Sequence, residues 1–337
     1  DSSNNDNSTN NDTPQVDSSE YALKTQITST DKITIRIAED ASEIHPSHIA
    51  LVNCFKEPLE AASNGNITVE IYPNGMLGSL TENVNSMQMG DLEMAYLNDS
   101  ILSGFIPEFS IIGLPYLFTS VDAVHNAMNG EFGEEMSSRL QDQLGIVNLG
   151  WCDVGFRNIT NSKKPITCAD DLKGLKIRTQ DSPTSIAMIR AMGGSATPMS
   201  SGETYTGLQQ GIIDGAENNE TVLVQDGHGE VCKSYTYTQH QMVPDIVIIS
   251  TETWESLDEA EQSAIVNGMT QGNEAHEAVW QDLVQENIDG AKEMGVQFYT
   301  IDKTAFIEAT QSLRDEFCAK SADNARYYED FLSYVQA

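Results

Sequence analysis

Two short apolar runs lead into side chains that are suited to bind a carboxylate. The first run ends at Arg178, and a second run further along the chain leads into the acid–amide cluster Glu217, Asn218 and Asn219. A guanidinium donates two parallel hydrogen bonds to a carboxylate, and amides both donate and accept hydrogen bonds. This combination indicates selective binding of a small organic acid. From the pattern alone, a structural ion pair for Arg178 remains an alternative.

Further candidates lie where other strands of the chain are expected to end. In α/β lobes, ligands bind outside the carboxyl ends of the strands. The remaining candidate contacts are Arg157, Gln180, Glu39 with its neighbour Asp40, Tyr96 and Asn98.

Motifs for catalysis and for metal binding are missing from the sequence. His45 and His48 stand close together, but no set of carboxylates or cysteines completes a metal site. Glu203 and Glu217 are imaginable as acid and base, yet nothing fixes their separation. No nucleophile elbow, P-loop or dinucleotide fingerprint occurs. We therefore expect no cofactor and no metal. The alternative of another class is an enzyme in which Arg178 orients a carboxylic acid substrate.

The chain is strongly acidic. Its 337 residues contain 51 acidic and 18 basic side chains, giving a net charge of -33. Such a surface repels nucleic acid and anionic lipid, so neither is an expected partner. Screening limits the repulsion to roughly 8 Å at physiological salt, so a local arginine can still bind an anion.

The five cysteines are scattered, with no CxxC motif. An odd number leaves at least one thiol unpaired within a single chain. Buried free thiols are expected for most of them, and a Cys168–Cys232 disulfide stays open.

The N-terminal segment is polar and has almost nothing to bury. We expect residues 1–30 to form a disordered polar tether, with a lipidated cysteine as the candidate anchor before residue 1. No stretch reaches the ~18 apolar residues that span a bilayer. These features favour an extracytoplasmic location.

From Lys32 onward, strand-like and helical patterns alternate, which favours α/β lobes with largely parallel sheets. The predicted first lobe comprises residues 31–155 and 245–284. The predicted second lobe comprises residues 156–244 and 285–337.

The chain is predicted to cross between the lobes at three places. Two are near Asp153 and Pro244, and the third is a long helical stretch from Leu257 to about Met294. We also expect Ile212–Asp214 to begin the strand that leads into the acid–amide cluster.

Several segments, in order, resemble the solute-binding proteins of tripartite ATP-independent periplasmic (TRAP) transporters, the DctP-type family. The likeness extends from about Lys32 to Leu313. Its best markers are ITVEIYPNGMLGS (67–79), PEFSIIGLPYLF (107–118), GFRNITNSKKPI (155–166), DLKGLKIR (171–178), GETYTGLQQGIIDGAEN (202–218) and VPDIVIISTETW (243–254).

This resemblance implies two α/β lobes of the periplasmic-binding-protein (Venus flytrap) type, with crossover strands and a long helix that spans both lobes. It implies a binding subunit, not an enzyme, that holds an organic acid between the lobes, closes over it and delivers it to membrane permease subunits. The family pattern makes Arg178 the main carboxylate anchor, with Arg157 and Asn218 in the same cleft.

One departure concerns the wall of the cleft. The family commonly has an aromatic residue before the segment that starts at Gly202, where this chain has Ser200 and Ser201. The double asparagine Asn218–Asn219 and Gln180 resemble the branch associated with hexuronates. A sugar acid is therefore the favoured ligand, and a C4-dicarboxylate is the close alternative.

Overall fold

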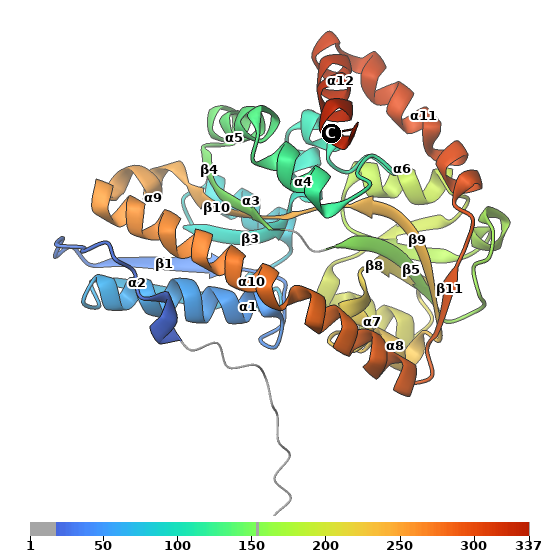
Figure 1. Ribbon diagram of the computed structural model, residues 1–337, viewed down its shortest axis with the longest axis horizontal. Helices are drawn as coiled ribbons and strands as arrows, with labels where there is room; N and C mark the ends of the chain where they lie inside the picture. The colour runs from blue at the N-terminus through green and yellow to red at the C-terminus, as the bar shows by residue number, and fades with distance from the viewer. Residues whose placement is uncertain (1–17, 153–154, 337) are drawn as a thin grey trace, which may run out of the picture.

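Two β-sheets, each covered by helices, form the protein (Figure 1). The structure is a computed structural model and describes residues 18–152 and 155–336. The first sheet has five strands in the order β2-β1-β3-β10-β4. Its strands are β1 (Ile33–Ala38), β2 (Ile67–Tyr72), β3 (Met94–Asn98), β4 (Ile146–Cys152) and β10 (Asp245–Ser250).

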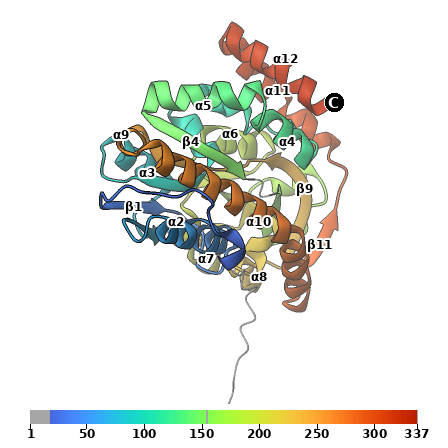
Figure 2. The same cartoon turned by 60° about the vertical axis from the view of Figure 1, so that its left-hand side comes forward.

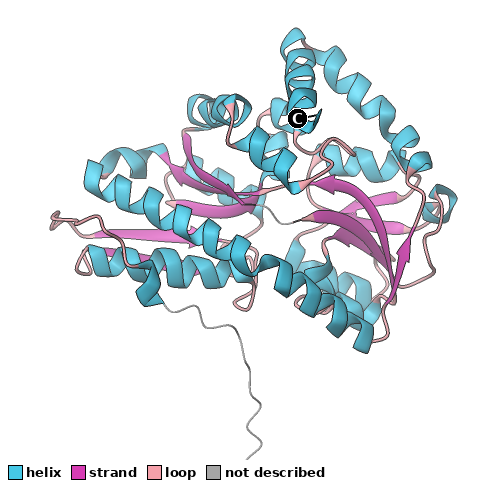
Figure 3. Ribbon diagram, in the orientation of Figure 1, coloured by secondary structure: helices cyan, strands magenta, loops and turns pink. Residues whose placement is uncertain are grey.

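The second sheet has six strands in the order β11-β9-β5-β8-β6-β7. The strands of the two sheets form separate groups in Figure 3. Those of the second sheet are β5 (Phe156–Asn161), β6 (Lys176–Thr179), β7 (Ser195–Pro198), β8 (Gly215–Asn218), β9 (Ser234–Met242) and β11 (Gln297–Thr300). The predicted mixed α/β architecture is confirmed.

Consecutive strands of the chain belong to different sheets at three places, the third being between β10 and β11. β4 lies in the first sheet and β5 in the second. β9 lies in the second sheet and β10 in the first. β10 runs antiparallel to β3, whereas β1 and β3 are parallel. The chain therefore crosses from sheet to sheet near Pro244, as the sequence predicted.

Helices and helical turns fill the connections between the strands. The α-helices are α1 (Pro46–Ala50), α2 (Glu57–Ala62), α3 (Leu80–Gln88), α4 (Val121–Met128), α5 (Glu131–Leu144), α6 (Pro183–Ala191), α7 (Ser201–Gln209), α8 (His228–Val231), α9 (Thr251–Ser256), α10 (Glu259–Glu293), α11 (Thr304–Lys320) and α12 (Ala322–Gln336). A π-helix, η2 (Leu51–Lys56), joins α1 to α2, and the 3-10 turns are η1 (Ser18–Tyr21), η3 (Asp99–Gly104), η4 (Pro107–Ile111), η5 (Ala169–Leu172) and η6 (Glu220–Leu223).

The long helix α10 contacts both lobes, as Figures 1 and 2 show. It begins at a capping box in which Asp258 accepts from the backbone N–H of Glu261, while the Glu261 side chain accepts from the N–H of Asp258. Its 35 residues pack on α1 and η2 near the first sheet and on η6 near the second. The predicted long helical stretch is confirmed.

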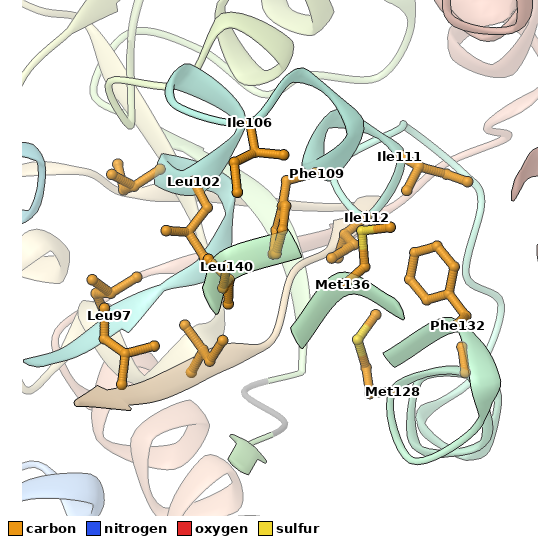
Figure 4. Packing of buried hydrophobic residues seen from close by; sticks show 14 of the residues in the cluster. Leu97, Leu102, Ile106, Phe109, Ile111, Ile112, Met128, Phe132, Met136 and Leu140 are labelled. Carbon is orange, nitrogen blue, oxygen red and sulfur yellow. The ribbon is translucent and has the colours of Figure 1, made fainter. Parts of the chain in front are cut away.

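The largest hydrophobic cluster lies between the first sheet and helices α3, α4, α5 and α12. Figure 4 shows part of it, with Phe109 and Phe132 among the labelled side chains. Phe331 of α12 packs edge-on against Phe132 and Phe118. The C-terminal helix thus rests on the first lobe, while α11 packs against α6 beside the second sheet. The predicted lobe boundaries within 285–337 remain a prediction.

Residues 18–30 differ from the expected polar tether, of which residues 1–17 lie outside the described residues. Ile27 is 4% exposed and belongs to the hydrophobic cluster beneath the first sheet. Leu23 packs on the same cluster, and Asn66 donates a hydrogen bond to the Ser29 carbonyl. Burial of these two apolar side chains stabilises the contact of this segment with the lobe, because the hydrophobic effect scales with buried area.

The strand that leads to the acid–amide cluster begins later than predicted. β8 starts at Gly215, and Ile212 is 51% exposed. Gly211 has a φ of +70°, and the Ile212 N–H bonds back to the Gly207 carbonyl, so these residues close helix α7. Cys168 and Cys232 are both free thiols, so the Cys168–Cys232 alternative is not realised. No helix in the described ranges has the length and apolar character to cross a bilayer.

Candidate functional site

Two cavities lie between the lobes and share the lining residues Asp40, Arg178, Gln180 and Ser201. The outer cavity has a volume of about 690 Å³ and opens between α3 of the first lobe and α7 of the second. The inner cavity, about 80 Å³, is lined mainly by polar side chains. The predicted candidates that line the inner cavity are Arg157, Arg178, Gln180, Asn98, Asn218, Asn219 and Tyr96.

Arg178 is held by the second sheet with its guanidinium facing the cavities. It lies on β6, between β7 and β8, and is only 5% exposed. Its Nε donates to the Met199 carbonyl at 2.9 Å. Its terminal nitrogens have no hydrogen-bond partner among the described residues. Burial lowers the pKa of this guanidinium, but an arginine remains charged throughout the physiological range.

Arg157 forms an ion pair with a neighbouring acid, Glu217. From β5 it donates to Glu217 of β8 through Nε at 2.5 Å and through a terminal nitrogen at 2.9 Å. It also donates to the Asn218 amide oxygen at 2.9 Å. Burial acts to raise the pKa of Glu217, but Arg157 and His240 outweigh it and hold that pKa at about 2. The pair is therefore ionised at neutral pH.

The amides of the site are fixed by hydrogen bonds from both lobes. The Gln180 oxygen accepts from the hydroxyl of Ser100 at 2.8 Å, a contact between the second and the first lobe. Asn98 donates to the Val243 carbonyl and to Asp245. These contacts orient Gln180 and Asn98 before any ligand arrives.

Asn219 and Tyr96 line the inner cavity from opposite lobes. Asn219 caps η6, because its amide oxygen accepts from the N–H and the hydroxyl of Thr221. Tyr96 lies on β3 and is 4% exposed.

Glu39 is the predicted candidate that lines neither cavity. It is completely buried, and its carboxylate hydrogen-bonds to the His48 ring. Successive residues of an extended chain point in opposite directions, so the next residue, Asp40, lines both cavities instead. Glu39 therefore lines neither cavity, and its contact with a ligand stays a prediction.

Asp226 and His45 also line the inner cavity, although no sequence pattern predicted either as a ligand contact. Burial raises the pKa of Asp226 to about 6, with the charge of Asp40 adding to the rise and Arg178 opposing it. Burial lowers the pKa of His45 to about 4, helped by His48, so this ring is neutral at pH 7. Asp226 follows a short turn and belongs to no motif, so no sequence signal distinguished it.

The mouth of the outer cavity lies between two helix starts. Ser79 and Glu82 form a capping box at α3, and Ser200 and Glu203 form another at α7. The two glutamates bond to the helix-terminal groups, which would otherwise attract an anion. Ser200 and Ser201 stand on this wall, where the family resemblance leads one to expect an aromatic residue. Arg178, whose terminal guanidinium nitrogens have no partner among the described residues, is therefore the main candidate on the cavity walls for binding an anion.

The chain belongs to the bacterial extracellular solute-binding proteins, family 7 (DctP), whose model matches residues 37–321. Proteins of this family are substrate-binding subunits of TRAP transporters, not enzymes. This finding agrees with the two-lobed architecture and with the cavity between the lobes.

Two similar proteins have been solved with a sugar acid bound, and a third relative is named for the sugar acid that it binds. A TRAP solute-binding protein from Anaerococcus prevotii with bound D-glucuronate is 37% identical, with a TM-score of 0.85 over 90% of this chain and 99% of that one. One from Xanthobacter autotrophicus with bound β-D-galacturonate is 29% identical, with a TM-score of 0.83 over 88% and 98%. The 2,3-diketo-L-gulonate-binding periplasmic protein YiaO of Escherichia coli is 30% identical over 84% of this chain and 87% of its own.

Proposed function

We propose that this protein captures a hexuronate-type sugar acid outside the cytoplasm and presents it to the membrane subunits of a TRAP transporter. The carboxylate of the ligand binds the terminal nitrogens of Arg178, and the amides of Gln180 and Asn218 bind its hydroxyls. The two similar proteins with bound D-glucuronate and galacturonate support this ligand class.

One observation carries the proposal: Arg178 is buried in a polar cavity and keeps its terminal nitrogens unpaired among the described residues. Burying a charge without a partner is costly, so such an arrangement is expected where an anionic ligand supplies the missing partner. Charge-assisted hydrogen bonds of this kind contribute roughly 1.5–3 kcal/mol each.

The mechanism is closure of the lobes around the ligand. A ligand that contacts both lobes binds the closed form better and shifts the population toward it. The cavity supplies such contacts, because Asp40 comes from the first lobe and Arg178 from the second. Exclusion of water then strengthens the contact between guanidinium and carboxylate.

The segment before the first lobe fits a tether in this scheme. The 1–17 stretch is rich in Ser, Asn and Asp, and a lipid attached before residue 1 would keep the protein close to the permease. Ligand binding does not require this stretch.

Calorimetric titration of the purified chain tests the function directly. We expect D-glucuronate or D-galacturonate to bind with micromolar affinity or better, about 8 kcal/mol, and to raise the melting temperature. Neutral D-glucose is the matched control without a carboxylate and should not bind measurably. Recovery of the unchanged sugar acid after incubation separates a binding protein from an enzyme. Binding of succinate in place of the uronates would instead favour the C4-dicarboxylate alternative.

A further inference from the structure

Three carboxylates line the inner cavity together with Arg178: Asp40, Asp226 and Asp245, of which Asp245 accepts a hydrogen bond from Asn98. Asp40 follows β1 of the first lobe, and Asp226 follows η6 of the second. Neither Asp40 nor Asp226 has an ion pair or a hydrogen bond with another side chain among the described residues. Asp40, Asp226 and Arg178 line the same cavity, where the charges of Asp40 and Arg178 both act on the pKa of Asp226.

The basic groups of the cavities cannot balance these acids and also bind two ligand carboxylates. The basic residues on the described walls are Arg157, Arg178 and His45. Arg157 is already neutralised by Glu217 through two hydrogen bonds. His45 is uncharged at pH 7, since burial keeps its pKa at about 4. One cationic position therefore remains for an anionic ligand.

We propose that Asp40 and Asp226 act together as specificity determinants, accepting hydrogen bonds from the hydroxyls of a sugar monocarboxylate and repelling ligands with a second carboxylate. This inference rests on the proposed function of the cavity and adds the basis of its selectivity. An ionised carboxylate accepts hydrogen bonds only, so it pairs with a hydroxyl donor but not with another carboxylate. Selection thus combines an attractive contact with a repulsive one.

Because Asp40 belongs to the first lobe and Asp226 to the second, the charge of a ligand also affects how readily the lobes close over it. Without a ligand, closure moves one carboxylate toward the other, which is unfavourable for like charges. A polyhydroxylated ligand places hydroxyl donors between the two acids and removes this repulsion. A dicarboxylate anchored at Arg178 adds a negative charge instead, so closure over it is disfavoured.

The test compares D-glucuronate with D-glucarate, a sugar acid that carries a carboxylate at both ends. Calorimetry on the full chain should give a wild-type affinity for glucuronate at least about 30-fold higher than for glucarate. In Asp40→Asn and Asp226→Asn we expect glucuronate to bind about threefold to tenfold more weakly and glucarate to bind more tightly. Asp142→Asn removes an equal charge from an exposed site on α5 and should leave both affinities unchanged.

Two results would overturn the inference while leaving the proposed function intact. One is a wild-type protein that binds glucarate as tightly as glucuronate, a measurement that needs no variant. The other is a glucuronate-to-glucarate ratio in both aspartate variants that matches the Asp142→Asn control. If the wild-type protein binds no uronate at all, the proposed function itself fails.

Discussion

The buried guanidinium of Arg157 and the carboxylate of Glu217 form a two-pronged ion pair, with Nε 2.5 Å from Oε2 and a terminal nitrogen 2.9 Å from Oε1. The pair joins β5 to β8 and fixes Asn218, which accepts from the same guanidinium. The two arginines of the cavity thus differ in whether their guanidinium groups are already paired. Arg157 is part of the protein's own charge balance, and Arg178 is available to a ligand.

Replacing Arg178 with Ala should weaken uronate binding by at least about 2 kcal/mol, close to 30-fold, because the ligand carboxylate loses its charged partner. Arg178→Lys should also lose affinity, since an ammonium cannot reproduce the two parallel hydrogen bonds. Calorimetry measures both effects, with a thermal melt to check that the variants are folded. An unchanged dissociation constant in Arg178→Ala would show that the carboxylate binds elsewhere.

Glu217→Gln should lower the free energy of unfolding by up to about 3–5 kcal/mol, because it leaves a buried guanidinium without its counter-charge. Urea denaturation measures the change. The matched control is Glu108→Gln, which affects the half-buried pair of Glu108 and Arg139 and should cost less than about 1 kcal/mol. Equal losses in the two variants would contradict the special role of the buried pair.

Because of this ion pair, we expect the free energy of unfolding to decrease at acidic pH. The folded-state pKa of Glu217 is about 2, below its value of roughly 4.3 in an unfolded chain. Its stabilisation is therefore complete above pH 4.3 and is lost as the pH falls toward 2. Denaturation at a series of pH values should show a smaller loss across this window in Glu217→Gln than in the wild-type protein.

Asp226→Asn should make the unliganded protein more stable at neutral pH. The folded-state pKa of Asp226 is about 6, above the roughly 3.9 of an unfolded chain, so the folded state binds the proton more tightly. Stability from this group is present below pH 3.9 and is lost as the pH rises through 6. At pH 7.5 the variant should gain on the order of 1 kcal/mol, and the gain should vanish near pH 4. A gain that is the same at both values would exclude titration of Asp226 as its cause.

Gly215→Ala should disrupt the strand that carries the site. A Cβ at this position would lie 2.3 Å from the Thr160 carbonyl and 2.7 Å from the Asn161 Cβ. β8 must then shift away from β5, which displaces Glu217 and Asn218, and we expect lower stability as well as weaker uronate binding. Gly104→Ala is the control, because its Cβ would meet nothing within 4 Å. Normal binding by a stable Gly215→Ala protein would show that β8 tolerates the shift.

The sequence predicted the alternation of strands and helices, the long helical stretch and the polar residues at strand ends, because each rests on a local signal, whereas the two lobes were implied by the family resemblance. The period-two pattern around Ile35 and the β-branched run of β10 identify buried strands without reference to the rest of the chain. Arg178 was found because it directly follows such a run. The orientation of Glu39 depends on how β1 ends and on the proximity of His48, which the pattern does not contain. Asp226 reaches the cavity through the path of a connecting loop, and Ile27 is buried only because helix and sheet form a surface for it. These features arise from long-range packing, which a single sequence does not encode locally.

The C-terminal pair of helices connects the two halves of the molecule from outside the cleft. α11 packs on α6, whereas α12 places Phe331 against Phe118, which precedes α4, and against Phe132 of α5. Any rotation of one half relative to the other must therefore change the angle or the strain at the bend near Lys320, which is exposed. An environment-sensitive dye attached through Lys320→Cys should change its emission when sugar acid is captured. The same chain could then serve as a reagentless optical sensor whose reporter lies far from the bound molecule.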